Sequence, residues 1–275
     1  MKIAIVTSLN RKLDDYYAHR FYKTYNWPFD CYIYHEGWIP EIDPERNIFH
    51  RDIHDTNPTL KDFIKRNENR NQFSTIRGTD NSQIVYGLDF IKDAIRFSYK
   101  VYAKTHLMLE GNYDYVFWID ADVMFKKQLT EEIILRDILP EDKTICYLDR
   151  PAPPFYPECG FVGYNLKHPE VQNFVNEWEQ LYITDNIFKL LEWHDSFVFW
   201  HLIKKFKKEK SIKVNDIGHM KGVKGHHVFI NSELGLYIDH MKGKRKQAGT
   251  SGKDDLRKAP TLEYWKQVPT FWKQK

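Results

Sequence analysis

The feature that most constrains the fold is a short apolar run that ends in two acidic residues. Residues 115–119 are all apolar and mostly aromatic or β-branched, and a Gly-Asn pair at 111–112 comes shortly before them. A run of this length and composition predicts a buried strand. Asp120 and Asp122 follow directly. Because residues two apart along a strand point to the same side, we expect these two carboxylates to converge.

Two convergent carboxylates at the end of a buried strand repel each other, which is costly unless a cation lies between them. Hard oxygen ligands favour Mg²⁺ or Mn²⁺, which usually keep coordination positions open for substrate phosphates. Open α/β sheets bind ligands at the carboxyl ends of their strands, where this pair lies. We therefore interpret Asp120 and Asp122 as part of a metal-diphosphate site. The alternative is a pair of solvated turn acids, since a bare D-x-D is common by chance.

The composition bounds the class of protein. The 275 residues suffice for one large domain, or for a domain with an extension. Lys and Arg number 41 against 38 Asp and Glu, and this net charge of +3 does not indicate a nucleic-acid-binding protein. The three cysteines are widely spaced and form no C-x-x-C pair, which fits ordinary thiols in a reducing compartment.

No segment predicts insertion into a membrane. The apolar runs stay well short of the ~20 residues of a membrane span. The amino terminus turns polar too soon for a signal peptide, and residues 2–7 predict a first strand instead. We therefore expect a cytoplasmic protein without a transmembrane segment, for which a peripheral contact with a membrane stays open.

The apolar patterns predict strands and helices along the whole chain. Strands are expected at residues 2–7, 31–34, 144–148 and 158–165 and within residues 47–55, with a strand-like run at 235–238. Helices are expected at residues 14–25, 90–109 and 171–181, and a fourth helix is expected to begin at residues 194–196 within the segment 191–203. Residues 66–83 are rich in Asn, Arg, Ser, Thr and Gly and predict a loop.

Several side chains outside the acidic pair are candidates for the same site. Thr7 and Ser8 end the first strand at the sheet edge where the acidic pair is expected. Arg96, Lys100 and Lys104 recur every four residues on one face of the helix that precedes the D-x-D strand. This basic stripe is either a solvated face or, for Arg96 or Lys100, a contact with the phosphates or sugar of a donor.

A late segment offers an imidazole and several cations. The strand-like run at 235–238 leads to Asp239 and His240, and imidazole is a common ligand of Mn²⁺-class metals. Cations at positions 242, 244, 245 and 246 surround Gly243, which lets backbone N–H groups approach an anion. One metal ligand together with Lys242 and Lys246 suits a metal-bound diphosphate.

Two further motifs lie between the D-x-D and the late segment. Residues 158–165 read E-C-G-F-V-G-Y-N, in which Gly160 and Gly163 flank an apolar pair, and this suits a strand where the backbone approaches a ligand closely. Residues 193–196 read W-H-D-S at the start of a predicted helix. Asp195 there is either a helix cap or a functional acid.

Taken in order, these motifs resemble those of nucleotide-sugar glycosyltransferases with the GT-A fold. That family combines an amino-terminal nucleotide-binding half, a D-x-D after an aromatic strand, an acid on the acceptor side and a late His-x-x-Gly-x-x-Lys. Residues 120–122 match the D-x-D, and residues 240–246 look like the glycogenin-type carboxyl loop. W-H-D-S resembles the W-H-D-E of the blood-group and α-1,3-galactosyltransferase family. E-C-G-F-V-G-Y-N is similar to the segment that such enzymes place beside the sugar.

The resemblance implies an α/β fold with one Rossmann-like GT-A domain over residues 1–246, built on a mixed, mostly parallel sheet flanked by helices. Within it, residues 1–122 would bind the nucleotide sugar and residues 123–246 would form the acceptor-side half. Residues 247–275 would be a carboxyl-terminal extension that packs on the domain.

The resemblance also implies a reaction. A hexosyl or pentosyl unit would move from a nucleotide diphosphate sugar, with UDP favoured, to a hydroxyl of a glycan acceptor. A Mn²⁺ or Mg²⁺ ion held by Asp120, Asp122 and His240 would neutralise the leaving diphosphate. The residues expected at the donor are Thr7, Ser8, Arg96, Lys100, Asp120, Gly160, Lys242, Gly243 and Lys246.

One position departs from the family pattern. The glutamate of W-H-D-E, proposed as the catalytic acid of a retaining enzyme, is Ser196 here, which is neither a carboxylate nucleophile nor a base. An inverting enzyme needs one carboxylate as general base for the acceptor hydroxyl. We therefore favour inversion with Asp195 as the base, with Asp149 and Glu158 as rivals, and keep retention as the alternative.

Other classes of protein fit less well. A phosphohydrolase of the haloacid dehalogenase type also has a D-x-D after an apolar strand, but it needs Thr or Val where this chain has Met124, and its motif comes early. A sugar-nucleotide pyrophosphorylase needs a glycine-rich amino-terminal loop, which T-S-L-N-R-K is not. A glycan-binding protein without catalytic activity remains a third alternative.

Overall fold

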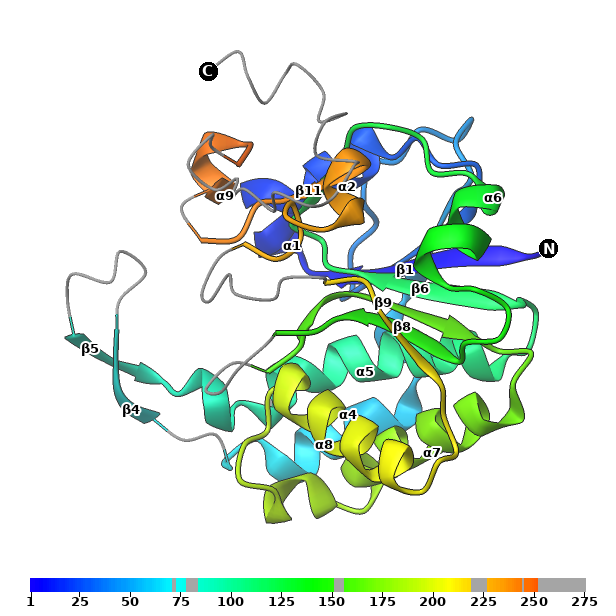
Figure 1. The fold of residues 1–275 in the computed structure, drawn as a ribbon. Helices are drawn as coiled ribbons and strands as arrows, with labels where there is room; N and C mark the ends of the chain where they lie inside the picture. Colours follow the sequence, from blue (N-terminus) through cyan, green and yellow to red (C-terminus); the bar gives the residue numbers. More distant parts are fainter. Residues whose placement is uncertain (71–72, 78–83, 151–155, 219–226, 244, 252–275) are drawn as a thin grey trace.

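The computed structural model describes residues 1–70, 73–77, 84–150, 156–218, 227–243 and 245–251. It has an α/β fold in which a seven-stranded, mostly parallel sheet lies between two layers of helices, and this confirms the fold class predicted from the sequence (Figure 1). The strand order is β10-β8-β9-β6-β1-β2-β3. The strands are β1 Ile3–Leu9, β2 Asp30–His35, β3 Ile48–Asp52, β6 Tyr115–Ile119, β8 Ile145–Leu148, β9 Glu158–Asn165 and β10 Val214–Asp216.

The sheet is mixed because of one strand. β9 runs antiparallel to both of its neighbours, β6 and β8, whereas the other neighbouring strands pair in parallel. The first residue of β9 therefore lies at the same edge as the last residues of β6. This reversal brings a residue 38 positions beyond Asp120 to the carboxyl end of the central strands.

Alternating residues of the central strands pack into two separate apolar cores. On β1, Ile3 and Ile5 pack into one core and Ala4 and Val6 into the other. Every residue of β6 is buried, as expected for a strand covered on both faces. The continuous apolar run that predicted this strand is thus a consequence of helices on both faces of the sheet.

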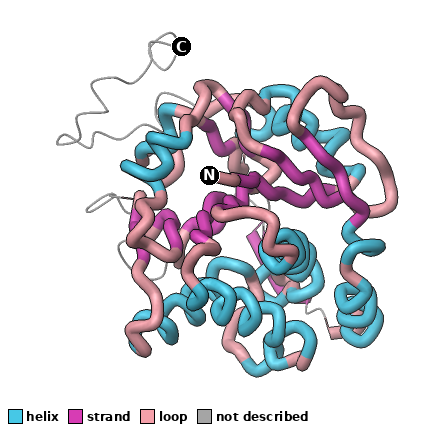
Figure 2. The backbone as a smooth tube through the Cα atoms, turned by 90° about the vertical axis from the view of Figure 1, so that its right-hand side faces the viewer, coloured by secondary structure: helices cyan, strands magenta, loops and turns pink. Residues whose placement is uncertain are grey.

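The helices form two layers (Figures 1 and 2). One layer holds α3 Ile53–Thr56, α4 Pro58–Asn67, α5 Ala94–Leu109, α7 Pro169–Ile183 and α8 Asp195–Lys208. The other holds the shorter elements α1 Arg11–Leu13, α2 His19–Thr24, α6 Glu131–Ile133 and α9 Arg245–Ala248. Turns of π-helix lie between α1 and α2 and after α6, and turns of 3₁₀ helix at Phe90–Lys92, Asn186–Lys189 and Glu233–Leu236. Within the described part of the chain, every helix is too short or too polar to span a bilayer.

A second small sheet joins distant parts of the chain. β7 Val123–Phe125 pairs antiparallel with β11 Ile238–His240, so that His240 lies opposite Val123. The backbone N–H of Met241 then donates to the carbonyl oxygen of Asp122 at 2.8 Å. This pairing places the late basic segment beside the D-x-D.

Two sequence expectations need correction. The loop predicted at 66–83 is wrong in part, because β4 Phe73–Arg77 pairs antiparallel with β5 Ile84–Leu88, two runs rich in the β-branched and aromatic residues that favour strands. The helix predicted from residue 90 begins at Ala94, where Asp93 caps it. The strand expected within residues 47–55 is confirmed as β3, which ends at Asp52, whose side chain caps α3. The extension predicted at 247–275 lies outside the described residues from 252 onward.

Gly163 on β9 has a packing role. A Cβ atom at this position would lie 2.4 Å from Cε1 of Phe117 and 2.6 Å from Sγ of Cys146, both in the core. The sequence interpretation of Gly163 as a point of close approach to a ligand is therefore wrong, because the close neighbours are core side chains.

We predict that Gly163→Ala lowers the free energy of unfolding by about 1–3 kcal/mol, the usual cost of inserting a methyl group into a packed core. Urea unfolding followed by tryptophan fluorescence measures this change. Asn47→Ala, at an exposed position just before β3, is the matched control and should leave the midpoint unchanged. Equal midpoints for the two variants would contradict the packing assignment.

Candidate metal centre

Three potential metal ligands meet at the carboxyl edge of the sheet. Asp120 follows β6, Glu158 begins the antiparallel β9, and His240 ends β11. Their ligand atoms all lie within 4.8 Å of one another. A backbone hydrogen bond of 2.9 Å from the N–H of Asp120 to the carbonyl of Gly160 fixes the two strands at this point. We call Asp120, Glu158 and His240 the ligand cluster.

The residues of the ligand cluster fit a divalent ion. Two carboxylates and one imidazole suit Mn²⁺-class metals. Nδ1 of His240 is buried and has no hydrogen-bonding partner among the described residues. Gly160 leaves room beside the cluster, since a Cβ atom there would lie 3.1 Å from Cε1 of His240 and 3.3 Å from Oδ2 of Asp120. A larger residue would fill the space between these two side chains.

Asp122 lies next to the cluster and pairs with cations. Its Oδ1 is 3.0 Å from Nε2 of His240, and its Oδ2 is 3.0 Å from Nζ of Lys246. Burial alone raises the pKa of Asp122, but His240 and Lys246 outweigh burial and hold that pKa below its ordinary value. Burial lowers the pKa of His240, but Asp122 and Glu158 outweigh it, so the pKa is raised. The imidazolium form thus partly compensates the surrounding carboxylates.

Glu158 is also held between cations. Its Oε2 is 3.0 Å from Nζ of Lys242, and Arg150 forms a second ion pair with it. Although burial raises the pKa of Glu158, Lys242 and Arg150 outweigh burial and lower it. The candidate metal centre therefore alternates acids and cations, which are joined by charge-assisted hydrogen bonds.

The loop that carries Lys242 and Lys246 is anchored to the domain. Nη1 of Arg20 donates to the carbonyl oxygen of Lys246 at 2.7 Å. Asp239 is fully buried, pairs with Lys126 at 3.3 Å and accepts a 2.7 Å hydrogen bond from the N–H of Ser251. The turn itself passes through Gly243 at a φ of +63°, a left-handed conformation that favours glycine.

Lys100 links the cluster to the start of α8. Its Nζ lies 2.7 Å from Oδ1 of Asp120, 2.7 Å from Oδ2 of Asp195 and 2.6 Å from the carbonyl oxygen of Cys159. Nε1 of Trp118 donates to the same Oδ1 of Asp120 at 2.7 Å. One oxygen of Asp120 is thus fixed by two donors, while its other oxygen faces Gly160 and the cluster.

The basic stripe of α5 is not a solvated face. Lys100 is 8% exposed and Lys104 is fully buried, so this interpretation is wrong for both. They lie inside because α5 packs with one side on the sheet and with another against α7 and α8. Arg96 alone is exposed, and its guanidinium lies 5.8 Å from the ring centroid of Phe97, with no described contact to the cluster.

Asp195 is the first residue of α8 and is buried. Burial raises its pKa, but the ion pair with Lys100 outweighs burial and lowers it, which reduces its basicity. Asp149, a rival for the role of base, follows β8, and its pKa is raised by burial and by Asp216. Among the described contacts, none joins Asp149 to the ligand cluster.

Thr7 and Ser8 lie near the carboxyl end of β1, beside β6. The last β1–β6 pair joins Val6 to Trp118, two residues before the first acid. Thr7 is fully buried, and its Oγ1 has no hydrogen-bonding partner among the described residues. Within that part of the chain, no contact connects either side chain with the cluster.

The sequence does not predict several of these contacts. It offers Glu158 only as a rival base, and it gives no role at the site to Arg150, Trp118, Arg20 and Lys126. The missing information is the direction of the strand at residues 158–165, which a pattern of apolar residues does not reveal. Once β9 runs antiparallel to β6, its first residue must lie beside the last residues of β6.

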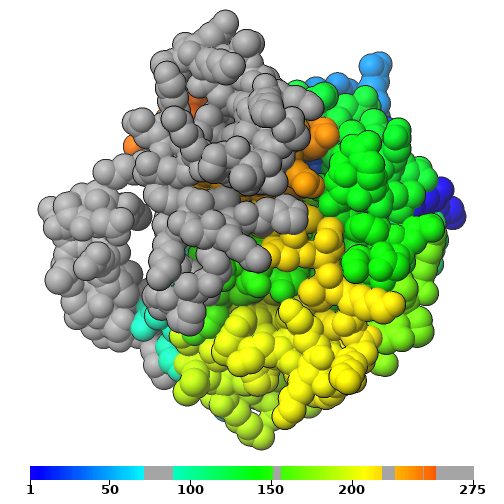
Figure 3. Space-filling view, in the orientation of Figure 1, coloured from blue at the N-terminus to red at the C-terminus, as the bar shows by residue number. Residues whose placement is uncertain are grey.

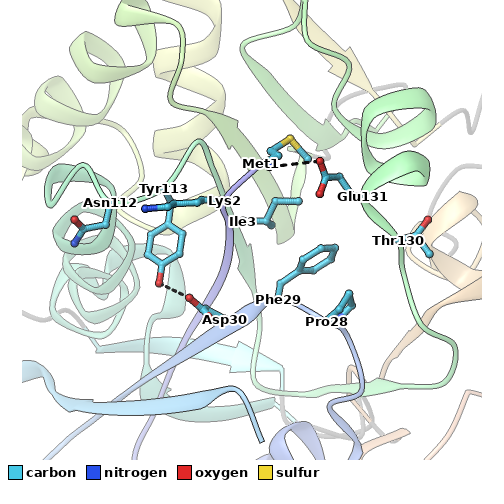
Figure 4. A pocket seen from close by; sticks show the side chains of 10 residues that line it. All are labelled: Met1, Lys2, Ile3, Pro28, Phe29, Asp30, Asn112, Tyr113, Thr130 and Glu131. Atoms are coloured by element: carbon cyan, nitrogen blue, oxygen red, sulfur yellow. Dashed lines mark hydrogen bonds and ion pairs between the residues drawn. The ribbon is translucent and has the colours of Figure 1, made fainter.

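A separate hollow of about 610 Å³ lies at the opposite end of the sheet (Figure 4). It is lined by the start of β1, the start of β2 and the residues before β6 and α6. Its acids already have partners: Asp30 accepts a 2.8 Å hydrogen bond from Tyr113, and Glu131 lies 3.7 Å from the amino terminus. None of the sequence-predicted site residues lines this hollow.

No protein-family model matches the chain, and no curated protein matches it. Among solved structures, the fold is similar to that of mouse xyloside xylosyltransferase 1 in its apo form. The TM-score is 0.44 and the sequence identity 9%, with 78% of this chain and 85% of that chain covered.

We predict a pH dependence of stability that arises from Lys104. Its Nζ lies 3.3 Å from the ring centroid of Trp178 without a hydrogen-bonding partner among the described residues, and burial lowers its pKa from 10.5 to about 7. At this residue, the unfolded chain binds more protons than the folded one between these values. The contribution of Lys104 to the free energy of unfolding should therefore rise with pH across that window, by up to about 1.4 kcal/mol per pH unit.

Lys104→Met should lower the slope of the free energy of unfolding against pH relative to the wild type, because it removes the group that must lose its proton on folding. Urea unfolding at a series of pH values from about 7 to 10.5 measures the slope. Lys65→Met, at an exposed position of α4, is the matched control and should keep the wild-type slope. A wild-type slope in Lys104→Met would contradict the assignment.

Proposed function

We propose that this protein is a metal-dependent glycosyltransferase that moves a sugar from a nucleotide diphosphate sugar, with UDP favoured, to a glycan hydroxyl. The observation that carries the proposal is the meeting of Asp120, Glu158 and His240 at the carboxyl edge of the sheet, with Lys242 and Lys246 beside them. Acids that can hold a divalent ion and lysines that can pair with phosphates are the two components that a metal-bound diphosphate needs.

The roles of the side chains follow from their positions. Asp120, Glu158 and His240 would hold the ion, with Asp122 as the carboxylate that the sequence resemblance adds to this set. The bound ion would supply Lewis-acid stabilisation of the charge that develops on the leaving diphosphate. Lys242 and Lys246 lie within ion-pair distance of the acids and would exchange those partners for phosphate oxygens. Gly160 keeps open the space between Asp120 and His240.

Two roles are proposed for Asp195, according to whether its ion pair with Lys100 opens. If the pair opens when the substrates bind, the freed carboxylate can take the proton of the acceptor hydroxyl, and the product has inverted configuration. If it stays closed, Asp195 is a positioning residue that holds Lys100 against Asp120, and retention of configuration becomes the alternative. NMR of the anomeric configuration of the product distinguishes inversion from retention.

The first test of the function is binding. With Mn²⁺, UDP-sugars should raise the melting temperature, and without metal they should raise it much less, because a ligand stabilises only the state that binds it. Asp120→Asn should abolish the metal-dependent part. Asp142→Asn removes the same charge at an exposed position after the helical turn 134–138 and is the control. A shift that is independent of metal in the wild type would overturn the metal-dependent proposal.

A second test concerns the ligand set. The resemblance implies Asp120, Asp122 and His240, whereas the described geometry groups Glu158 with Asp120 and His240. If Glu158 is a ligand, Glu158→Gln should weaken Mn²⁺ binding at least about tenfold, as typical for a lost metal-site residue. Calorimetric titration of Mn²⁺ into Glu158→Gln and Asp122→Asn compares the two carboxylates. Wild-type affinity in Glu158→Gln would return the site to the sequence-derived set.

A further inference from the structure

A group of aromatic side chains lies where α8 begins, next to the candidate metal centre. We call it the aromatic surface and define it by Phe90, Phe97, Tyr156, His194 and Trp200. The ring of His194 lies 5.0 Å from Phe90 and 5.5 Å from Tyr156, and Tyr156 lies 5.4 Å from Trp200. Phe90 also packs on Phe97 at 5.9 Å. These residues come from the 3₁₀ turn before α5, from α5, from the segment before β9 and from α8.

Part of this aromatic surface is open to solvent. Phe90 is 49% exposed, while Tyr156 and Trp200 are partly exposed and His194 is buried beneath them. α8, which carries Trp200, lies on the face of the molecule seen in Figure 3, where it is coloured yellow. Monomeric proteins rarely expose a cluster of large apolar groups with a polar rim. Such a cluster marks a binding surface.

A carboxylate contacts two members of the aromatic surface. Oε1 of Glu192 accepts a 2.9 Å hydrogen bond from the hydroxyl of Tyr156, and Oε2 lies 2.7 Å from Nε2 of His194. The side chain of Glu192 remains 24% exposed. Since each carboxylate oxygen has two lone-pair sites, both oxygens can accept a further hydrogen bond from a bound molecule.

This combination suits a sugar ring. A pyranose has faces of C–H groups, which pack against aromatic rings, and a rim of hydroxyls, which donate to carboxylates. Sites for small ligands combine aromatic walls with a few placed polar groups in the same way. A stable protein interface needs about 800 Å² on each partner, far more than a few partly exposed rings provide. The observations therefore favour a glycan over a protein partner.

The aromatic surface is linked to the candidate metal centre through the start of α8. His194 directly precedes Asp195, whose carboxylate pairs with Lys100 at 2.7 Å, and Lys100 pairs with Asp120 at the same distance. A sugar stacked on Phe90 or Trp200 would thus lie on the α8 side of the ligand cluster. We propose that the aromatic surface binds the acceptor glycan by stacking and through Glu192; this inference rests on the proposed function.

The test uses the full chain and simple sugars. Saturation-transfer NMR measures binding of the methyl glycosides of glucose, galactose, xylose and N-acetylglucosamine, which lack an aromatic aglycone that would itself stack. The wild type should transfer saturation to at least one of them. Phe90→Ala should reduce that signal and raise the KM for the same acceptor about tenfold, the equivalent of one lost stacking contact of roughly 1.4 kcal/mol.

Phe49→Ala is the matched control, since Phe49 is 46% exposed on β3 and stacks on Tyr32 at 5.2 Å, away from the aromatic surface. It should keep wild-type binding and KM. Because Phe90 is also half exposed, its replacement should cost little stability, and Trp200→Ala provides a second variant with the same expected loss.

Each failure has its own meaning. Equal signals from Phe90→Ala, Trp200→Ala and Phe49→Ala, or no saturation transfer to any methyl glycoside from the wild type, would overturn the assignment of the aromatic surface. Metal-dependent hydrolysis of UDP-sugars by the wild type, measured in the same samples, tests the proposed function independently. Sugar binding at this surface without any such hydrolysis would contradict the proposed transferase activity and would favour a glycan-binding protein.

Discussion

The candidate metal centre depends on the pairing of two three-residue strands that are more than a hundred positions apart. β7 continues from the D-x-D, and β11 delivers His240 to it, with the N–H of Met241 bound to the carbonyl of Asp122. Closing so long a loop costs conformational entropy, although that cost grows only slowly with length. Burial of Phe125 and Ile238 in the core offsets it. Without this pairing, the acids of β6 and β9 would have no imidazole and fewer cations beside them.

The pairing also explains how so many charges are tolerated at partly buried positions. Buried charges persist when they are paired, and every acid at the candidate metal centre has at least one cation within 3.0 Å. Under the proposed function, a metal-bound diphosphate would enter by exchange of partners. The metal ion would replace the cations that pair with the carboxylates, and the lysines released in this way would pair with the phosphates. Such an exchange would keep the charges compensated.

Much of the fold could be predicted from the sequence, whereas only part of the site could. The apolar run 115–119 and its acids were enough to predict a buried strand that ends in a polar edge, and the structure has both. Periodicity does not show strand direction, so Glu158 was not expected among the ligands. Nor does it separate a solvated stripe from a buried one: Lys100 and Lys104 follow helical spacing, yet they lie inside because α7 and α8 cover that side of α5.

The contacts of Lys100 connect two predictions from the sequence. One is its own contact with the sugar donor, and the other is the role of Asp195 as base. An ammonium group has three N–H bonds that can donate hydrogen bonds. In Lys100 they reach Asp120, Asp195 and the carbonyl of Cys159 at 2.6–2.7 Å. Lys100 therefore cannot reach a donor phosphate without releasing one of these three partners. If it releases Asp195, the same movement frees a carboxylate on the acceptor side. In that case, a contact of Lys100 with the sugar donor and a role of Asp195 as base would be coupled through one ammonium group.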